Sequence, residues 1–110
     1  MKKKNRIRKS MEFQELIHSG RKAANASFVY YSWPRKEAQA RIGISLSRKM
    51  GHAVDRNLFK RQVRMMCQEL VDFASFERDG VLIVRFGYRS RSYEENKKNL
   101  EKLLCNTTIR

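Results

Sequence analysis

The stretch from about Ala53 to Leu70 carries the most constraining pattern in the sequence. Its apolar residues recur at helical spacing, which places Phe59, Val63 and Met66 on one stripe together with Leu70. A pattern of this length predicts an amphipathic helix that must bury one face against other elements. Any fold for this chain therefore needs a second layer that covers this helix.

Three apolar segments are candidates for that second layer. Residues 26–33 (ASFVYYSW) are rich in aromatic and β-branched residues, and residues 41–47 (RIGISLS) alternate large and small side chains. These two predicted strands are close in sequence, so we expect them to pair as an antiparallel hairpin. Residues 81–86 follow an Asp-Gly turn signal and form a short apolar run typical of a buried strand.

Two further helices are predicted near the ends of the chain. The first begins after Ser10, which can cap it, and ends near Gly20. The last opens with a capping box made by Ser92 and Glu95. The order is helix, two or more strands, helix, strand, helix. This order predicts an α+β fold, a two-layer sandwich of a small mixed sheet and helices, as one domain over residues 1–110.

The charge of the chain restricts its partners. It contains 25 Lys and Arg residues against 11 Asp and Glu residues, a formal net charge of +14. Such a surplus favours a polyanionic partner, and together with an apolar core it indicates nucleic acid. A membrane partner is disfavoured because the longest aliphatic run, residues 81–84, is far shorter than the ~20 residues that span a bilayer. We expect a cytoplasmic protein whose basic residues 1–9 form an arm that can fold against phosphates.

Residue types that usually build an active site or a metal site are sparse. The acidic residues are scattered, and His18 and His52 are isolated from each other in sequence. Cys67 and Cys105 have no metal-ligand spacing, so reduced thiols that serve packing are expected. The sequence therefore predicts no catalytic residue, metal site or cofactor in the protein itself.

The basic residues of the central helix are arranged more regularly. Arg56, Lys60 and Arg64 follow one another at i, i+4 spacing and border the apolar stripe. Successive positions are about 6 Å apart along a helix axis, close to the spacing of phosphates along a strand. Like charges stacked in this way are unfavourable unless something neutralises them, and no acidic partners accompany them at helical spacing. An ordinary solvated helix face is the alternative interpretation.

The same region resembles a known family. Residues 41–61, RIGISLSRKMGHAVDRNLFKR, closely resemble the signature of the bacterial ribonuclease P protein family: a hydrophobic strand, Ser-(Lys/Arg)-Lys, a glycine, Ala-Val and an Arg-Asn-Arg region. Residues 6–14 resemble the family's entry to its first helix, and residues 92–95 are similar to the start of its last helix. The resemblance covers nearly the whole chain in the expected order.

The resemblance implies a fold and a function. The fold would include a left-handed βαβ crossover, against the usual right-handed preference. The protein would be the subunit of ribonuclease P that binds the catalytic RNA and the 5′ leader of precursor tRNA, with one protein per RNA. Magnesium would be held mainly by the RNA, which would cleave off the leader and produce the mature 5′ end.

The resemblance also assigns residues to two RNA-binding surfaces. The first contacts the catalytic RNA and comprises basic or amide side chains: Arg48, Lys49, Arg56, Asn57, Lys60, Arg61 and Arg64, with Arg6 and Arg8 of the arm. The second is a cleft for the single-stranded leader, in which Phe13 and Tyr31 match aromatic positions that can stack on bases, beside Ile17. Core packing is the alternative role for both aromatic residues.

Three residues depart from the family pattern or stand out from it. Leu58 replaces the third member of the Arg-Asn-Arg run, and Ile17 stands where many relatives carry a second aromatic residue. Asp55 is an acid among the arginines; it either serves the first turn of the helix or holds Arg56 or His52 in place. A structural ribosomal protein and a free-standing nuclease remain the rival functions.

Overall fold

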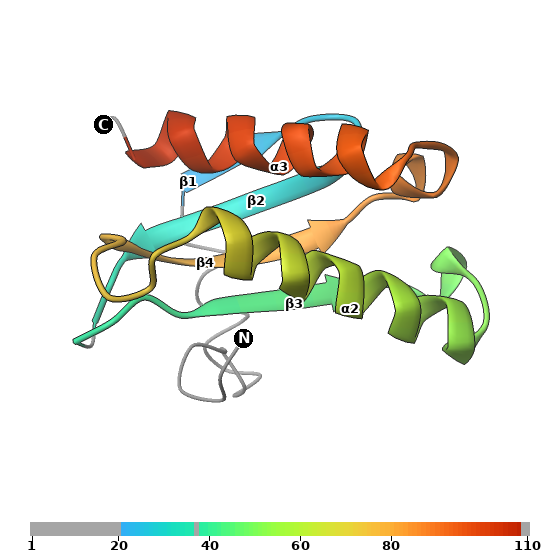
Figure 1. Cartoon of the computed structure of the whole chain (residues 1–110), viewed down its shortest axis with the longest axis horizontal. Coiled ribbons are helices and arrows are strands. Elements are labelled where there is room, and N and C mark those ends of the chain that lie inside the picture. Colours follow the sequence, from blue (N-terminus) through green and yellow to red (C-terminus); the bar gives the residue numbers. More distant parts are fainter. Residues whose placement is uncertain (1–20, 37, 109–110) are drawn as a thin grey trace.

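The computed structural model of the protein describes residues 21–36 and 38–108. Two helices lie over one face of a four-stranded sheet (Figure 1). The elements, with two short 3-10 turns labelled η, are β1 (Arg21–Ala24), β2 (Phe28–Pro34), β3 (Ile42–Leu46), η2 (Arg48–Met50), α2 (Ala53–Leu70), β4 (Arg78–Val84), η3 (Phe86–Ser90) and α3 (Tyr93–Thr108). The predicted α+β sandwich is confirmed, whereas the helix expected after Ser10 falls outside the described residues.

The strand order corrects one prediction. The sheet has the order β1-β2-β4-β3, so β2 and β3 do not form the hairpin expected from their closeness in sequence. Instead β4 lies between them, antiparallel to β2 and parallel to β3. The physical reason is the burial of β4, where Asp79, Gly80, Val81 and Leu82 are all buried. A central position gives this strand a hydrogen-bonding neighbour on each side.

The connection from β3 through α2 to β4 joins two parallel strands. In Figure 1 both strands point to the right, α2 runs in front of them, and β4 lies above β3. This arrangement makes the crossover left-handed, against the usual preference. As a consequence, α2 lies over the edge strand β3, while α3 lies over β2.

The core fills the space between the helices and the sheet. In α2, Val63 and Met66 are fully buried and Phe59 and Leu70 pack against the core, which confirms the predicted stripe. Cys67 joins them. The sheet and α3 contribute the remaining large residues: Phe28, Tyr30, Ile42, Leu82, Val84, Leu100, Leu103 and Leu104.

The ends of the helices follow local chemistry. Ser92 and Glu95 form the predicted capping box, in which each backbone N–H donates to the other's side-chain oxygen at 3.2 Å. The hydrogen bond that the Glu95 carboxylate accepts from the backbone N–H of Ser92 is the largest cause that lowers the pKa of this carboxyl, and the Ser92 side chain lowers it further. Before α2, Gly51 has a φ of 127°, and a Cβ there would lie only 3.0 Å from Oδ2 of Asp55. Only glycine fits this approach to the helix without strain.

A polar network attaches α3 to the turn between β1 and β2. The Ser27 hydroxyl donates to Oδ1 of Asn96 at 2.6 Å and accepts from Nδ2 of Asn99 at 2.8 Å. Nδ2 of Asn96 donates in turn to the carbonyl of Tyr88 at 3.1 Å. The network therefore fixes three segments to one another: the β1–β2 turn, η3 and the first half of α3.

Candidate nucleic-acid interface

Within the described residues, the basic and amide side chains predicted to contact the catalytic RNA all lie on η2 and α2. Arg48 and Lys49 are exposed on η2, which leads directly into α2. The helical conformation of residues 53–70 confirms the spacing on which the basic stripe was predicted. We call this set the α2 basic surface: Arg48, Lys49, Arg56, Asn57, Lys60, Arg61 and Arg64.

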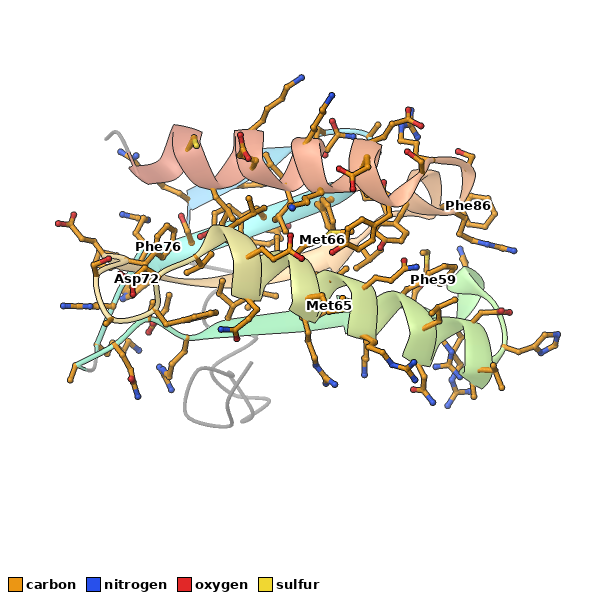
Figure 2. The ribbon with its side chains drawn as sticks, in the orientation of Figure 1. Phe59, Met65, Met66, Asp72, Phe76 and Phe86 are labelled. Atoms are coloured by element: carbon orange, nitrogen blue, oxygen red, sulfur yellow. The ribbon has the colours of Figure 1, made fainter. Side chains whose placement is uncertain are left out.

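The members of this surface differ in burial in a way that suits long cationic side chains. Arg56, Lys60 and Arg64 are half-buried because they border the core stripe, whereas Asn57 and Arg61 are exposed. Figure 2 shows side chains with nitrogen tips along the side of α2 that faces away from α3. The half-buried residues can thus pack their aliphatic stems on the protein while their charged ends reach solvent.

Asp55 does not neutralise this surface. Between positions 48 and 68 it is the sole acidic residue in the sequence. Among the residues that the structure describes, it forms no ion pair with Arg56 or His52. It lies instead in the first turn of α2, packed against Gly51. Of the two roles left open by the sequence, the geometry favours the first turn of the helix, where a negative charge is favourable.

The outer face of α2 is apolar where the family pattern has a further cation. Leu58 is 44% exposed, and it lies between Val54 and Met65, which are 80% and 51% exposed. Residues four and seven positions apart share a helix face, so these three side chains line the solvent side of α2. The outer face of α2 therefore lacks a positive charge at position 58. The half-buried row of Arg56, Lys60 and Arg64 is not affected by this difference.

Tyr31 lies on the other side of the sheet. Tyr30 points into the core under the helices, so its neighbour Tyr31 points away from them. Tyr31 is half-buried, and the Lys22 ammonium lies 5.9 Å from the centre of its ring. The structure therefore separates Tyr31 from the α2 basic surface by the thickness of the sheet.

Sequence reasoning missed a second aromatic residue on this face. Trp33 follows Tyr31 at strand spacing, and the Lys36 ammonium lies 5.8 Å from its ring. Trp33 and Ile83 pack on Val81, which makes a small apolar cluster apart from the main core. The alternation of Tyr31 and Trp33 in one strand, followed by a lysine, could have predicted this pair.

The remaining predicted site residues lie outside the described residues. They are Arg6 and Arg8 of the basic arm, and Phe13 and Ile17 of the expected first helix. The structure thus brings together the α2 basic surface and places Tyr31 on the opposite face of the sheet.

The described residues contain no cluster of three or more His, Cys, Asp and Glu side chains that could hold a metal ion. Cys67 and Cys105 are both free thiols, and burial raises the pKa of Cys67 to about 12.

Within residues 21–36 and 38–108, no helix has the length and apolar composition to cross a membrane. What the arrangement offers is cationic and amide donors suited to phosphate oxygens.

Comparison with known proteins gives one consistent result. The family model described as ribonuclease P matches residues 1–108. A ribonuclease P protein component from Bacillus mycoides is 45% identical over 101 residues, which cover 91% of this chain and 88% of the relative. The structure of the RNase P protein from Staphylococcus aureus is similar with a TM-score of 0.83 and 30% identity, covering 96% of each chain. That from Thermotoga maritima has a TM-score of 0.77 and 25% identity, covering 90% of this chain and 94% of the other.

Proposed function

The chain belongs to the ribonuclease P protein family, and we propose that it is the protein subunit of a ribonuclease P that removes the 5′ leader from precursor tRNA. The single observation that carries this proposal is the family match over nearly the whole chain, including the basic run on α2. The subunit binds one catalytic RNA molecule and the precursor tRNA, in the cytoplasm, and it contributes no catalytic residue of its own.

The α2 basic surface contacts the catalytic RNA in this proposal. Its guanidinium and ammonium groups neutralise phosphates, which reduces the repulsion between the catalytic RNA and its RNA substrate. The RNA carries out the phosphodiester hydrolysis with magnesium ions that it largely holds itself. The protein acts on the reaction by positioning the two RNA molecules.

The opposite face of the sheet contacts the single-stranded leader. Tyr31 presents a ring beside the Lys22 ammonium, and Trp33 repeats this arrangement with Lys36. A ring next to a cation suits a nucleotide, because the base can stack while the phosphate meets the charge. Phe13 and Ile17 would complete this site. Binding energy spent on the leader distinguishes precursor tRNA from mature tRNA, which lacks it.

Salt dependence of binding to a bacterial ribonuclease P RNA tests the extended basic surface. If about six phosphates are neutralised, the logarithm of the affinity falls with the logarithm of the salt concentration at a slope of roughly −4 to −5. A slope near −1 would contradict the surface.

A pair of matched double variants locates the contact. Lys60→Gln with Arg64→Gln removes two charges at i, i+4 spacing from α2, and Lys98→Gln with Lys102→Gln removes two at the same spacing from α3. We expect the first pair to weaken RNA binding and to reduce the slope by about 1.5, and the second to change both much less. Equal effects of both pairs on RNA binding would indicate non-specific attraction. If the α2 pair lowered thermal stability as strongly as it lowered RNA affinity, its residues would be structural.

A further inference from the structure

Phe86 is a large apolar side chain that the fold leaves in solvent. It opens η3, directly after β4 and Arg85, and it is 64% exposed. The guanidinium of Arg89 lies over its ring, 5.2 Å from the ring centre. This contact covers one face of the ring, and the high exposure leaves most of the remaining ring surface open to solvent.

The turn that carries Phe86 is held rigidly. A Cβ at Gly87 would lie only 2.4 Å from the carbonyl oxygen of Ala26, so the turn is pressed against the β1–β2 connection.

The residue after Gly87, Tyr88, is fully buried, and its hydroxyl donates to Oε1 of Gln62 at 2.7 Å. Its ring packs edge to face on Phe28 and Phe59. Phe86 is therefore displayed outward by a turn whose neighbours are locked into the core.

Three arginines accompany the ring. Arg85, Arg89 and Arg91 lie on or beside η3, and the sequence has no acidic residue from position 80 to position 93. Hydrogen bonds to main-chain carbonyls hold two of them, from Arg85 to Asn25 and from Arg91 to Gly87, each at 2.8 Å. Fixed cations around an exposed ring suit a ligand with both an aromatic part and an anionic part.

This turn is also continuous with the α2 basic surface. η3 contacts η2, which carries Arg48 and Lys49. Figure 2 shows Phe86 at the same end of the molecule as Phe59 and the start of α2. An RNA strand bound along η2 and α2 would thus pass close to η3, which carries the Phe86 ring.

We propose that Phe86 is a stacking site for an unpaired base of the RNA that binds the α2 basic surface, with Arg89 on the other face of the ring. The inference rests on the proposed function and adds a recognition element to it. The base packs on the open face of Phe86, and the arginines of η3 meet the adjoining phosphates. A protein partner fits less well, because it would need an acidic surface to face this cluster.

Truncation of the ring provides the first test. Phe86→Ala should weaken binding to a bacterial ribonuclease P RNA roughly tenfold, because one base loses its stacking partner. The slope of affinity against salt should not change, since no charge is removed. Phe86→Trp should restore the affinity. Met65→Ala is the matched control, since it shortens another exposed apolar side chain, and it should leave the affinity unchanged.

A polyanion without bases separates stacking from charge. Heparin should bind Phe86→Ala and the unchanged protein equally well, whereas Arg89→Gln should weaken the binding of both heparin and RNA. If Phe86→Ala lost as much affinity for heparin as for RNA, the stacking site would be overturned. It would also be overturned if Phe86→Ala had the RNA affinity and the thermal stability of the unchanged protein.

A fluorescent reporter reads the contact directly. The sequence has a single tryptophan, Trp33, so Trp33→Phe with Phe86→Trp leaves one indole at the proposed site. Its emission should be quenched when the RNA binds. Unquenched emission at saturating RNA would overturn the stacking site and leave the proposed function intact, whereas absence of any RNA binding by the unchanged protein would overturn the proposed function.

Discussion

Cys67 and Cys105 show how the same side chain acquires different chemistry from its position. Cys67 lies on the core side of α2 and is fully buried, which raises the pKa of its thiol to about 12. Cys105 is exposed on α3. At pH 8 we expect a thiol reagent such as Ellman's to modify one cysteine of the native protein rapidly and both in denaturant. Cys105→Ser should abolish the rapid phase. Rapid reaction of Cys67 in the native state would show that α2 opens readily.

Asp79 is a buried acid with a structural role. Its carboxylate accepts from the backbone N–H of Arg41 at 2.9 Å and from the Arg41 guanidinium at 3.1 Å, which joins the approach to β3 to the start of β4. Asp79→Ala removes the acceptor of both hydrogen bonds, so it should lower the free energy of unfolding by about 3 to 5 kcal/mol. Chemical denaturation measures this change. Glu101→Ala, at an exposed position on α3, is the control, and equal effects would contradict the role of the pair.

At the residue scale, the sequence allowed the set of candidate residues to be predicted but not their partners. The i, i+4 spacing of Arg56, Lys60 and Arg64 follows from any helix, so it was predictable. The separation of Tyr31 from these residues was not, because it depends on which face of the sheet the helices cover. The packing of Asp55 against Gly51 was not predictable either, because it depends on the positive φ of that glycine.

At the scale of elements, local patterns predicted what local forces determine. The bounds of α2 and the capping box of α3 match the prediction, because periodicity and caps act within a few residues. The pairing of β2 with β3 was wrong, because β4 is brought between them by a helix that intervenes in the sequence. Strand pairing is a competition between distant segments, and here β4, which is more deeply buried than β3, takes the place beside β2.

The capping box of α3 gives a prediction at this scale. Ser92→Ala removes the cap and should lower the free energy of unfolding by about 1 kcal/mol.

Glu95 gives a second prediction, on pH dependence. Because its pKa is lowered in the folded state, the ionised carboxylate stabilises the fold above the unfolded pKa. This stabilisation is lost as the pH falls through the folded pKa. Thermal melts from pH 7 to pH 3 should therefore show that Glu95→Gln loses less stability on acidification than the unchanged protein. Identical pH profiles would contradict the lowered pKa.

At the scale of the whole molecule, the fold carries two different surfaces that we propose contact nucleic acid. The helices and the sheet form two layers, and the α2 basic surface lies on the helical side while Tyr31 and Trp33 lie on the other. The left-handed crossover places α2 over the edge strand β3, beside α3, which lies over β2. A subunit that joins two RNA molecules needs two such surfaces, whereas a single anchoring site on one RNA would need one.

This difference separates the proposed function from a structural ribosomal protein of similar size and charge. Affinity purification of the tagged protein from its own cells should recover a single RNA of a few hundred nucleotides. Recovery of ribosomal RNA in its place, with ribosomal subunits in the same fraction, would favour the rival function.

The most direct test of the account is cleavage of a 5′-labelled precursor tRNA at low magnesium concentration. The reaction is run with the protein alone, with a bacterial ribonuclease P RNA alone, and with both together. The account predicts strong cleavage at the mature 5′ end in the mixture only, because the protein supplies charge neutralisation and leader binding while the RNA supplies the chemistry. No gain from the folded protein, or cleavage by the protein alone, would contradict it.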